Sequence, residues 1–151
     1  MKKLLLITLL IMSIIIPTSA FANNEDRWKY AVHEEKNNNI TCVAAIDSTS
    51  IVVSGENINF WVRRTHSNEQ EIYGHWYSWD IANWEYNMST KSFRFGNEIY
   101  YNDSGKVVYS GSSTFSRWVR VVPASLGEAV IKSLLRILSE QNRINIPAEN
   151  L

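Results

Sequence analysis

Residues 125–138 read SLGEAVIKSLLRIL, and here the spacing of apolar residues changes from two to between three and four. Apolar residues at that spacing share one face of an α-helix. Ser125 and Glu128 stand three residues apart, so each side chain can accept a hydrogen bond from the other residue's backbone N–H at a helix start. The stretch predicts an amphipathic helix of about four turns. The positions that predict its buried face are Leu126, Val130, Leu134, Ile137 and Leu138.

Apolar and polar residues alternate along much of the chain before this helix, which is typical of β-strands. In the clearest strand, Ile58, Phe60 and Val62 fall on one face. Strands are expected at residues 27–33, 41–47, 51–53, 58–65, 72–86, 91–101, 106–110 and 115–122. Turns or loops are expected at residues 34–39, 54–57, 66–70, 87–90 and 102–105. Many strands followed by one helix predict an α+β fold, with an antiparallel β-sheet packed against one C-terminal α-helix.

The N-terminus has the features of a secretory signal peptide: Lys2 and Lys3, an apolar run, and Ala20 and Ala22 at the cleavage-site positions. The apolar run is shorter than the roughly 20 residues that span a bilayer, so we expect cleavage after Ala22 and no stable membrane span. No lipid-attachment cysteine follows, so we expect a periplasmic, secreted or cell-surface protein that is not a lipoprotein. The expected segments are a signal peptide at 1–22, one domain at 23–141 and a flexible C-terminal tail at 142–151.

The sequence has 15 basic and 15 acidic residues, and removal of the signal peptide with its two lysines leaves a weakly acidic chain. Nucleic-acid binding requires clustered Lys and Arg, so no nucleic-acid partner is expected. The single cysteine, Cys42, lies in an apolar run and is expected to be a buried core residue. An intermolecular disulfide and a catalytic thiol are the alternatives.

Motifs for catalysis, metal binding or nucleotide binding are missing from the sequence, so we expect no enzyme activity, no metal and no cofactor. The histidines are interpreted as ordinary strand-end or loop residues. The acidic residues interpreted as turn formers are Asp47, Asp80 and Asp103. The alternative is a small hydrolase in which His75 would meet Asp80 or Glu85 in a pocket.

The feature that best predicts binding is the aromatic stretch at residues 72–86. In one extended strand, Tyr73, His75, Tyr77 and Trp79 would share one side, with Trp76 and Ser78 on the other. A single helix covers one face of a sheet, so large rings on both faces predict that some are exposed. Exposed Trp, Tyr and Arg are enriched at binding hot spots. The predicted binding residues are Tyr73, Trp76, Tyr77, Trp79, Arg63 and Arg64; the alternative is that these rings pack the core or a dimer interface.

Four segments in this order carry a family resemblance: AIDSTSI at 45–51, NINFWVRR at 57–64, YNDSGKV at 101–107 and WVRVVPASLGE at 118–128. Together they resemble the surface-adhesin protein E family of small exported bacterial proteins. The resemblance implies about six antiparallel strands with a C-terminal helix, frequent dimers, and binding of host matrix and serum proteins such as vitronectin and laminin. The chain departs from the family in having no lipid-attachment cysteine and no paired cysteines.

These observations favour an exported, non-enzymatic binding module whose partner is a protein, with host extracellular matrix as the class that the resemblance implies. The alternative is a periplasmic accessory or structural protein that forms a homodimer through its sheet, motivated by the missing lipid signal.

Overall fold

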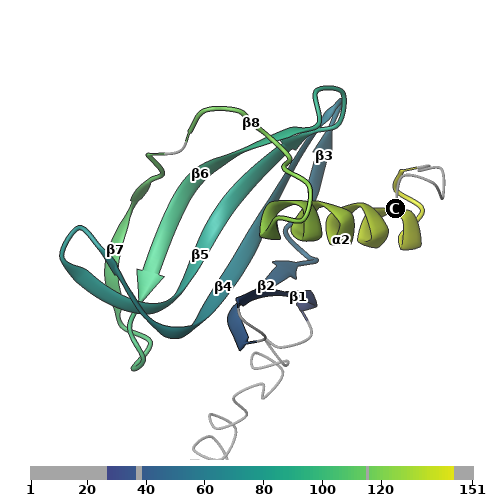
Figure 1. The fold of residues 1–151 in the computed structure, drawn as a ribbon. Coiled ribbons are helices and arrows are strands. Elements are labelled where there is room, and N and C mark those ends of the chain that lie inside the picture. The colour runs from purple at the N-terminus through teal and green to yellow at the C-terminus, as the bar shows by residue number, and fades with distance from the viewer. Residues whose placement is uncertain (1–26, 37–38, 115, 145–151) are drawn as a thin grey trace, which may run out of the picture.

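The computed structural model describes residues 27–36, 39–114 and 116–144. The expected signal peptide at 1–22 lies outside the described residues, as does most of the expected tail. In Figure 1 a sheet of strands is followed by a C-terminal helix. The strands are β1 (Trp28–Lys36), β2 (Asn39–Asp47), β3 (Val52–Ser54), β4 (Asn57–Ile72), β5 (His75–Asn87), β6 (Ser92–Tyr101), β7 (Val107–Ser112) and β8 (Val119–Arg120), and the helix is α2 (Leu126–Glu140).

The strands form one antiparallel sheet in the order β1-β2-β4-β5-β6-β7, with β3 pairing β4 and β8 pairing β6. The predicted antiparallel sheet with one C-terminal helix is confirmed. Among the described residues there are eight strands rather than about six, since β3 and β8 are short additional pairings. Of the stretch expected to be the last strand, only Val119–Arg120 pairs, with Ser92 and Phe93 of β6.

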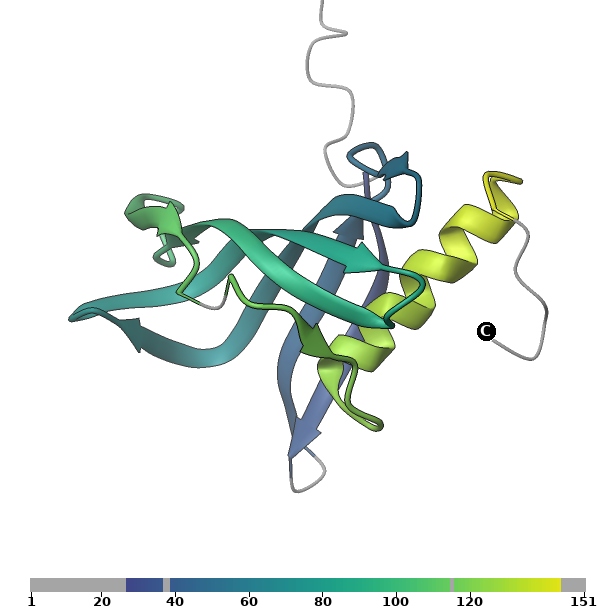
Figure 2. The ribbon, with the colours of Figure 1, turned by 90° about the horizontal axis from the view of Figure 1, so that it is seen from above.

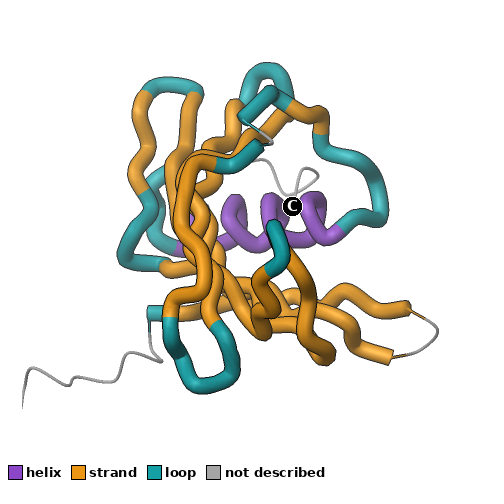
Figure 3. Tube along the Cα trace, turned by 90° about the vertical axis from the view of Figure 1, so that its left-hand side faces the viewer, coloured by secondary structure: helices purple, strands orange, loops and turns teal. Residues whose placement is uncertain are grey.

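Helix α2 lies in the concave side of the curved sheet, with strands around it on more than one side (Figure 3). Its buried residues are Val130, Ile131, Ser133, Leu134, Ile137 and Leu138. On the sheet, Ile58, Phe60 and Val62 are fully buried, as the alternation predicts. Trp84 packs among Phe60, Phe93 and Phe95 in the same core. Burial of these apolar faces against each other is the main force that holds the fold together.

The helix begins and ends with hydrogen-bonded caps. The Ser125 hydroxyl accepts from the Glu128 N–H at 3.1 Å, as expected, but the Glu128 carboxylate accepts from the Ala124 N–H at 2.8 Å rather than from Ser125. At the C-terminus Asn142 has a φ of 53°, and the Arg143 N–H bonds to the Leu138 carbonyl at 2.9 Å. This is a Schellman ending with Asn at the left-handed position. The Arg143 side chain also donates to the Ile51 carbonyl at 2.9 Å, which fixes the end of the helix against the chain before β3.

The β4–β5 hairpin differs from the sequence expectation. Residues 66–70, expected to be a polar loop, continue β4, and the chain turns at Tyr73–Gly74, where both residues have positive φ. A two-residue turn with two positive φ values suits the twist of antiparallel strands. Figures 1 and 2 both show this hairpin projecting at the end of the sheet away from α2. No helix in the described part of the chain is long and apolar enough to cross a membrane.

Candidate functional site

Beyond the end of α2, the side chains on the concave face of the sheet change from apolar to charged and aromatic. Along β4 the buried series Ile58, Phe60, Val62 continues with Arg64 and His66, which point to the same face because side chains alternate along a strand. Arg64 pairs across the sheet with Asp80 of β5, and Asp80 in turn pairs with Tyr100 of β6. The sheet therefore places charged and aromatic side chains where the helix no longer covers it.

Asp80 is the centre of a buried charged network. Its carboxylate is fully buried and accepts from the Arg64 guanidinium at 2.8 and 2.9 Å and from His66 Nε2 at 3.3 Å. Glu98 lies 3.8 Å from Arg64 and accepts from the Tyr100 hydroxyl at 3.0 Å. The interpretation of Asp80 as a turn residue is therefore wrong, and so is the assignment of His66 to a loop. A carboxylate at a core-facing position is stable only when cations of this kind neutralise it.

The network also shifts the ionisation of its members. Hydrogen bonding to Asp80, with the Cys42 thiol as a second partner, raises the pKa of His66 to about 9. Burial raises the pKa of Tyr77 and of Tyr100. For Arg64 burial alone would lower the pKa, but attraction to Asp80 outweighs it and the pKa is raised. The arginine and the histidine are thus both cationic at neutral pH.

We expect a His66→Gln variant to lose stability in a pH-dependent way. Because the folded-state pKa is raised, the imidazolium stabilises the fold fully below about pH 6.5, and this contribution is lost as the pH rises through about 9. Urea unfolding at about pH 6 should show a larger gap between wild type and variant than at about pH 9.5. His75→Gln, at the exposed hairpin, is the matched control. An equal difference in unfolding free energy between wild type and variant at both pH values would contradict the raised pKa of His66.

Next to this network lies a hollow of about 280 Å³, named here the tyrosine pocket. Its walls and floor are formed chiefly by Tyr73, Tyr77, Tyr100, Tyr109, Arg64 and Glu98. The four tyrosine rings follow one another in contact, with centroid distances of 5.2 Å from Tyr73 to Tyr109, 5.8 Å from Tyr109 to Tyr100 and 4.7 Å from Tyr100 to Tyr77. Tyr77 also makes an edge contact with His66 at 5.5 Å. The pocket is thus lined by aromatic rings together with one cation and one carboxylate.

The structure brings some of the predicted binding residues together and separates others. Tyr73, Tyr77 and Arg64 line the tyrosine pocket, whereas Trp76, which is 58% exposed, is on the same hairpin but outside the lining. Tyr73 forms part of the rim and is 62% exposed. Trp79 is elsewhere: it stacks on Tyr101 at 3.8 Å, on the opposite face of the sheet.

Arg63 also lies on that opposite face, where its guanidinium covers the Trp28 ring at 5.0 Å. The expectation that Tyr77 and Trp79 share one side is wrong, because Tyr77 contacts Tyr100 and Trp79 stacks on the next residue of β6. The reason is a bulge: Thr65 pairs with Trp79, whereas Gln70 pairs with Tyr77. Such a bulge re-aims the side chains beyond it.

Sequence reasoning missed His66, Asp80, Glu98, Tyr100 and Tyr109. One signal was available for the first two: a charged residue at a position that alternation assigns to the buried face. For the residues of β6 and β7 no signal was available, because their membership depends on the strand register.

The residues of the alternative hydrolase do not converge. His75 is exposed at the hairpin, Asp80 is engaged by Arg64 and His66, and Glu85 pairs with Arg94 at 2.5 Å. The expected burial of Cys42 is confirmed, since it is 2% exposed. Within the described ranges no three His, Cys, Asp or Glu side chains gather as a metal site would need.

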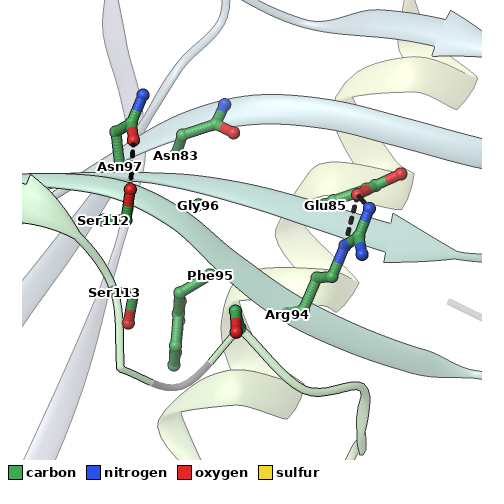
Figure 4. Close-up of a pocket in the computed structure, with 9 residues that line it drawn as sticks. Asn83, Glu85, Arg94, Phe95, Gly96, Asn97, Ser112 and Ser113 are labelled. Carbon is green, nitrogen blue, oxygen red and sulfur yellow. Dashed lines mark hydrogen bonds and ion pairs between the residues drawn. The ribbon is translucent and has the colours of Figure 1, made fainter.

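A second hollow of about 340 Å³ lies where Gly96 and Asn97 form a bulge opposite Asn83 (Figure 4). In it Arg94 reaches Glu85, and the Ser112 hydroxyl donates to Asn97 at 3.3 Å. The predicted binding residues lie outside its lining, and its polar side chains bond largely to one another. The tyrosine pocket with its exposed rim is therefore the stronger candidate for a binding site.

Comparison with known proteins identifies the family of the chain. The model of the surface-adhesin protein E family matches residues 28–134, and the chain belongs to that family. The family assignment supports an adhesin-like surface protein and agrees with the resemblance carried by the sequence motifs. The solved structure of Haemophilus influenzae protein E is similar, with a TM-score of 0.49 and 12% identity over 79% of this chain and 90% of that chain. The chain has no match among curated protein sequences.

Proposed function

We propose that this chain is an exported, non-enzymatic binding protein whose partner is a protein, and that the β4–β5 hairpin makes the contact. The partner class that the family suggests is a host matrix or serum protein, and the expected location is the periplasm, the cell surface or the medium. The observation that carries the proposal is the exposure of Tyr73 and Trp76, at 62% and 58%, on a projecting hairpin. Exposure of large apolar rings to water is unfavourable, and such rings are typical anchors of interfaces.

The neighbourhood of these rings supports the proposal. The buried network of Arg64, Asp80 and Glu98 holds β4, β5 and β6 together directly beneath the hairpin. A rigid base lowers the entropy lost when the exposed rings become ordered on binding. The hairpin that carries Tyr73 and Trp76 is thus supported by this network, at the end of the sheet away from α2 (Figure 2).

We expect Trp76→Ala and Tyr73→Ala each to weaken partner binding by about tenfold or more, since each ring removed from a hot spot costs at least about 1.4 kcal/mol. Binding of the mature protein to a panel of purified matrix and serum proteins should be measured by surface plasmon resonance. Circular dichroism should show that both variants stay folded, since neither ring belongs to the core.

The matched control is Trp118→Ala, because Trp118 is also exposed, at 42%, but lies outside the tyrosine pocket. It should bind the partner as wild type does. Loss of binding in Trp118→Ala with full binding in Trp76→Ala and Tyr73→Ala would place the contact elsewhere and refute the proposal.

A further inference from the structure

We infer that the tyrosine pocket is a binding site for one neutral sugar residue, so that the partner recognised at this end of the sheet carries a glycan. The inference rests on the proposed function in placing the partner at the β4–β5 hairpin. It adds the chemistry of the group that enters the pocket. Size, charge, hydrogen-bonding groups and wall geometry each limit what that group can be.

The size of the pocket suits a single small ring. Its volume of about 280 Å³ is just below the range of ligand pockets, about 300 to 1,000 Å³. A cofactor or a bulky peptide segment would not enter it, whereas one monosaccharide unit at the end of a glycan would.

The charges around the pocket exclude a charged ligand. The charged residues that line it are Arg64 and Glu98, and the guanidinium of Arg64 is already bound to the fully buried Asp80. Glu98 lies 3.8 Å from the same guanidinium, and His66 supplies a second cation to Asp80. Two cations thus face two carboxylates. An anion or a cation added here would leave one charge unbalanced in a poorly solvated place, which is costly.

The hydrogen-bonding groups of the pocket favour a ligand that both donates and accepts. Besides Arg64 as a donor and Glu98 as an acceptor, the lining residues Tyr73, Tyr77, Tyr109 and Thr114 carry hydroxyls that can do both. The hydroxyls of Tyr100 and Ser112 donate to Glu98 and Asn97 and can still accept. Sugar hydroxyls have the same double character. A purely apolar ligand would bury these groups without partners, at about 1–3 kcal/mol for each.

The tyrosine rings match the apolar C–H face of a sugar ring. Tyr73 and Tyr109 lie 5.2 Å apart with a tilt of 52° between ring planes, and Tyr77 and Tyr100 stand nearly perpendicular, at 77°. Tyr109 lies close over Gly111, where an added Cβ would stand only 2.8 Å from its hydroxyl oxygen. The C–H face of a sugar ring packs on the face of an aromatic ring, and four tyrosine rings line this hollow.

The direct test is a titration of ¹⁵N-labelled mature protein with glucose, galactose, mannose and N-acetylglucosamine, followed by NMR. At least one of these sugars should shift the amide signals of pocket residues such as Tyr73, Glu98 and Tyr109. Sodium phosphate and lysine, added at the same concentrations, should not. Tyr109→Ala should weaken the sugar affinity by about tenfold or more, and Trp118→Ala should leave it unchanged. If Tyr109→Ala does not fold, the titration of the wild-type protein still tests whether a sugar binds in the pocket.

A second arm separates this inference from the proposed function. A glycoprotein partner found by surface plasmon resonance is measured before and after enzymatic removal of its glycans, and free bacterial polysaccharide is tested beside it. Binding lost on deglycosylation identifies a host glycan, and binding of the polysaccharide alone identifies a bacterial one. Retained binding of the deglycosylated protein, lost in Trp76→Ala, would uphold the proposed function and overturn the sugar site. Pocket shifts with phosphate or lysine but with no sugar would also overturn it.

Discussion

Trp84→Ala is expected to lower the free energy of unfolding by about 3–5 kcal/mol, the range for removing a large ring from a packed core. Trp84 is 2% exposed and is surrounded by Phe60 at 6.1 Å, Phe93 at 5.0 Å and Phe95 at 4.7 Å between ring centroids. These rings come from three adjacent strands, so the cavity would lie where β4, β5 and β6 share the core. Guanidinium unfolding followed by far-UV circular dichroism measures the loss.

Two variants serve as controls for this prediction. Trp118→Ala removes an exposed indole and should change stability by no more than about 0.5 kcal/mol. Trp84→Phe keeps a ring and removes the indole N–H, which in the described structure is buried without a hydrogen-bond partner. It should therefore cost much less than Trp84→Ala. Equal losses from the two substitutions at position 84 would show that ring packing is not the source of stability.

Asp80→Ala is expected to destabilise the fold by about 3–5 kcal/mol, because removing one partner of a buried ion pair leaves the other charge uncompensated. Here two cations, Arg64 and His66, would lose the carboxylate that they share, and Asp80 itself is fully buried. Urea unfolding at neutral pH measures the effect. Glu69→Ala, an exposed acidic side chain on β4, is the control and should be close to neutral.

A double-mutant cycle tests whether the pair itself is responsible. Arg64→Ala alone should also be destabilising, but the double variant should lose less than the sum of the two, with a coupling of about 0.5–3 kcal/mol. Strictly additive losses would mean that Asp80 stabilises the sheet by another route.

The main parts of the fold were predictable because the spacing of apolar residues along the chain indicates which face of a strand or helix is buried. Ile58, Phe60 and Val62 alternate, and all are buried; Val130, Leu134 and Ile137 recur at helical spacing and cover them. The polar residues 66–70 were expected in a loop because nothing apolar marks them as a strand. They belong to β4, in which His66 pairs with Cys42 of β2 and Gln70 pairs with Tyr77 of β5. Backbone pairing of this kind does not require apolar side chains.

The candidate site was only partly predictable. The aromatic stretch contributes Tyr73 and Tyr77 to the lining of the tyrosine pocket and Trp76 to the exposed surface of the same hairpin, and their role in binding stays a prediction. Trp79 was assigned to the same side because an uninterrupted strand was assumed. The bulge between Thr65 and Gln70 interrupts the strand, and no residue type in the stretch indicates its presence.

The amino-acid sequence alone was enough to establish the apolar core positions of β4 and α2, where the helix begins, and which family the chain resembles, since each of these depends on local sequence patterns. The tertiary structure was needed to place Arg64, Tyr77, Glu98 and Tyr109 around one hollow. These residues come from four strands, and their meeting depends on the register of three strand pairs and on one bulge. Register is a property of the paired strands together, and a shift of a single residue would turn the same side chains to the opposite face.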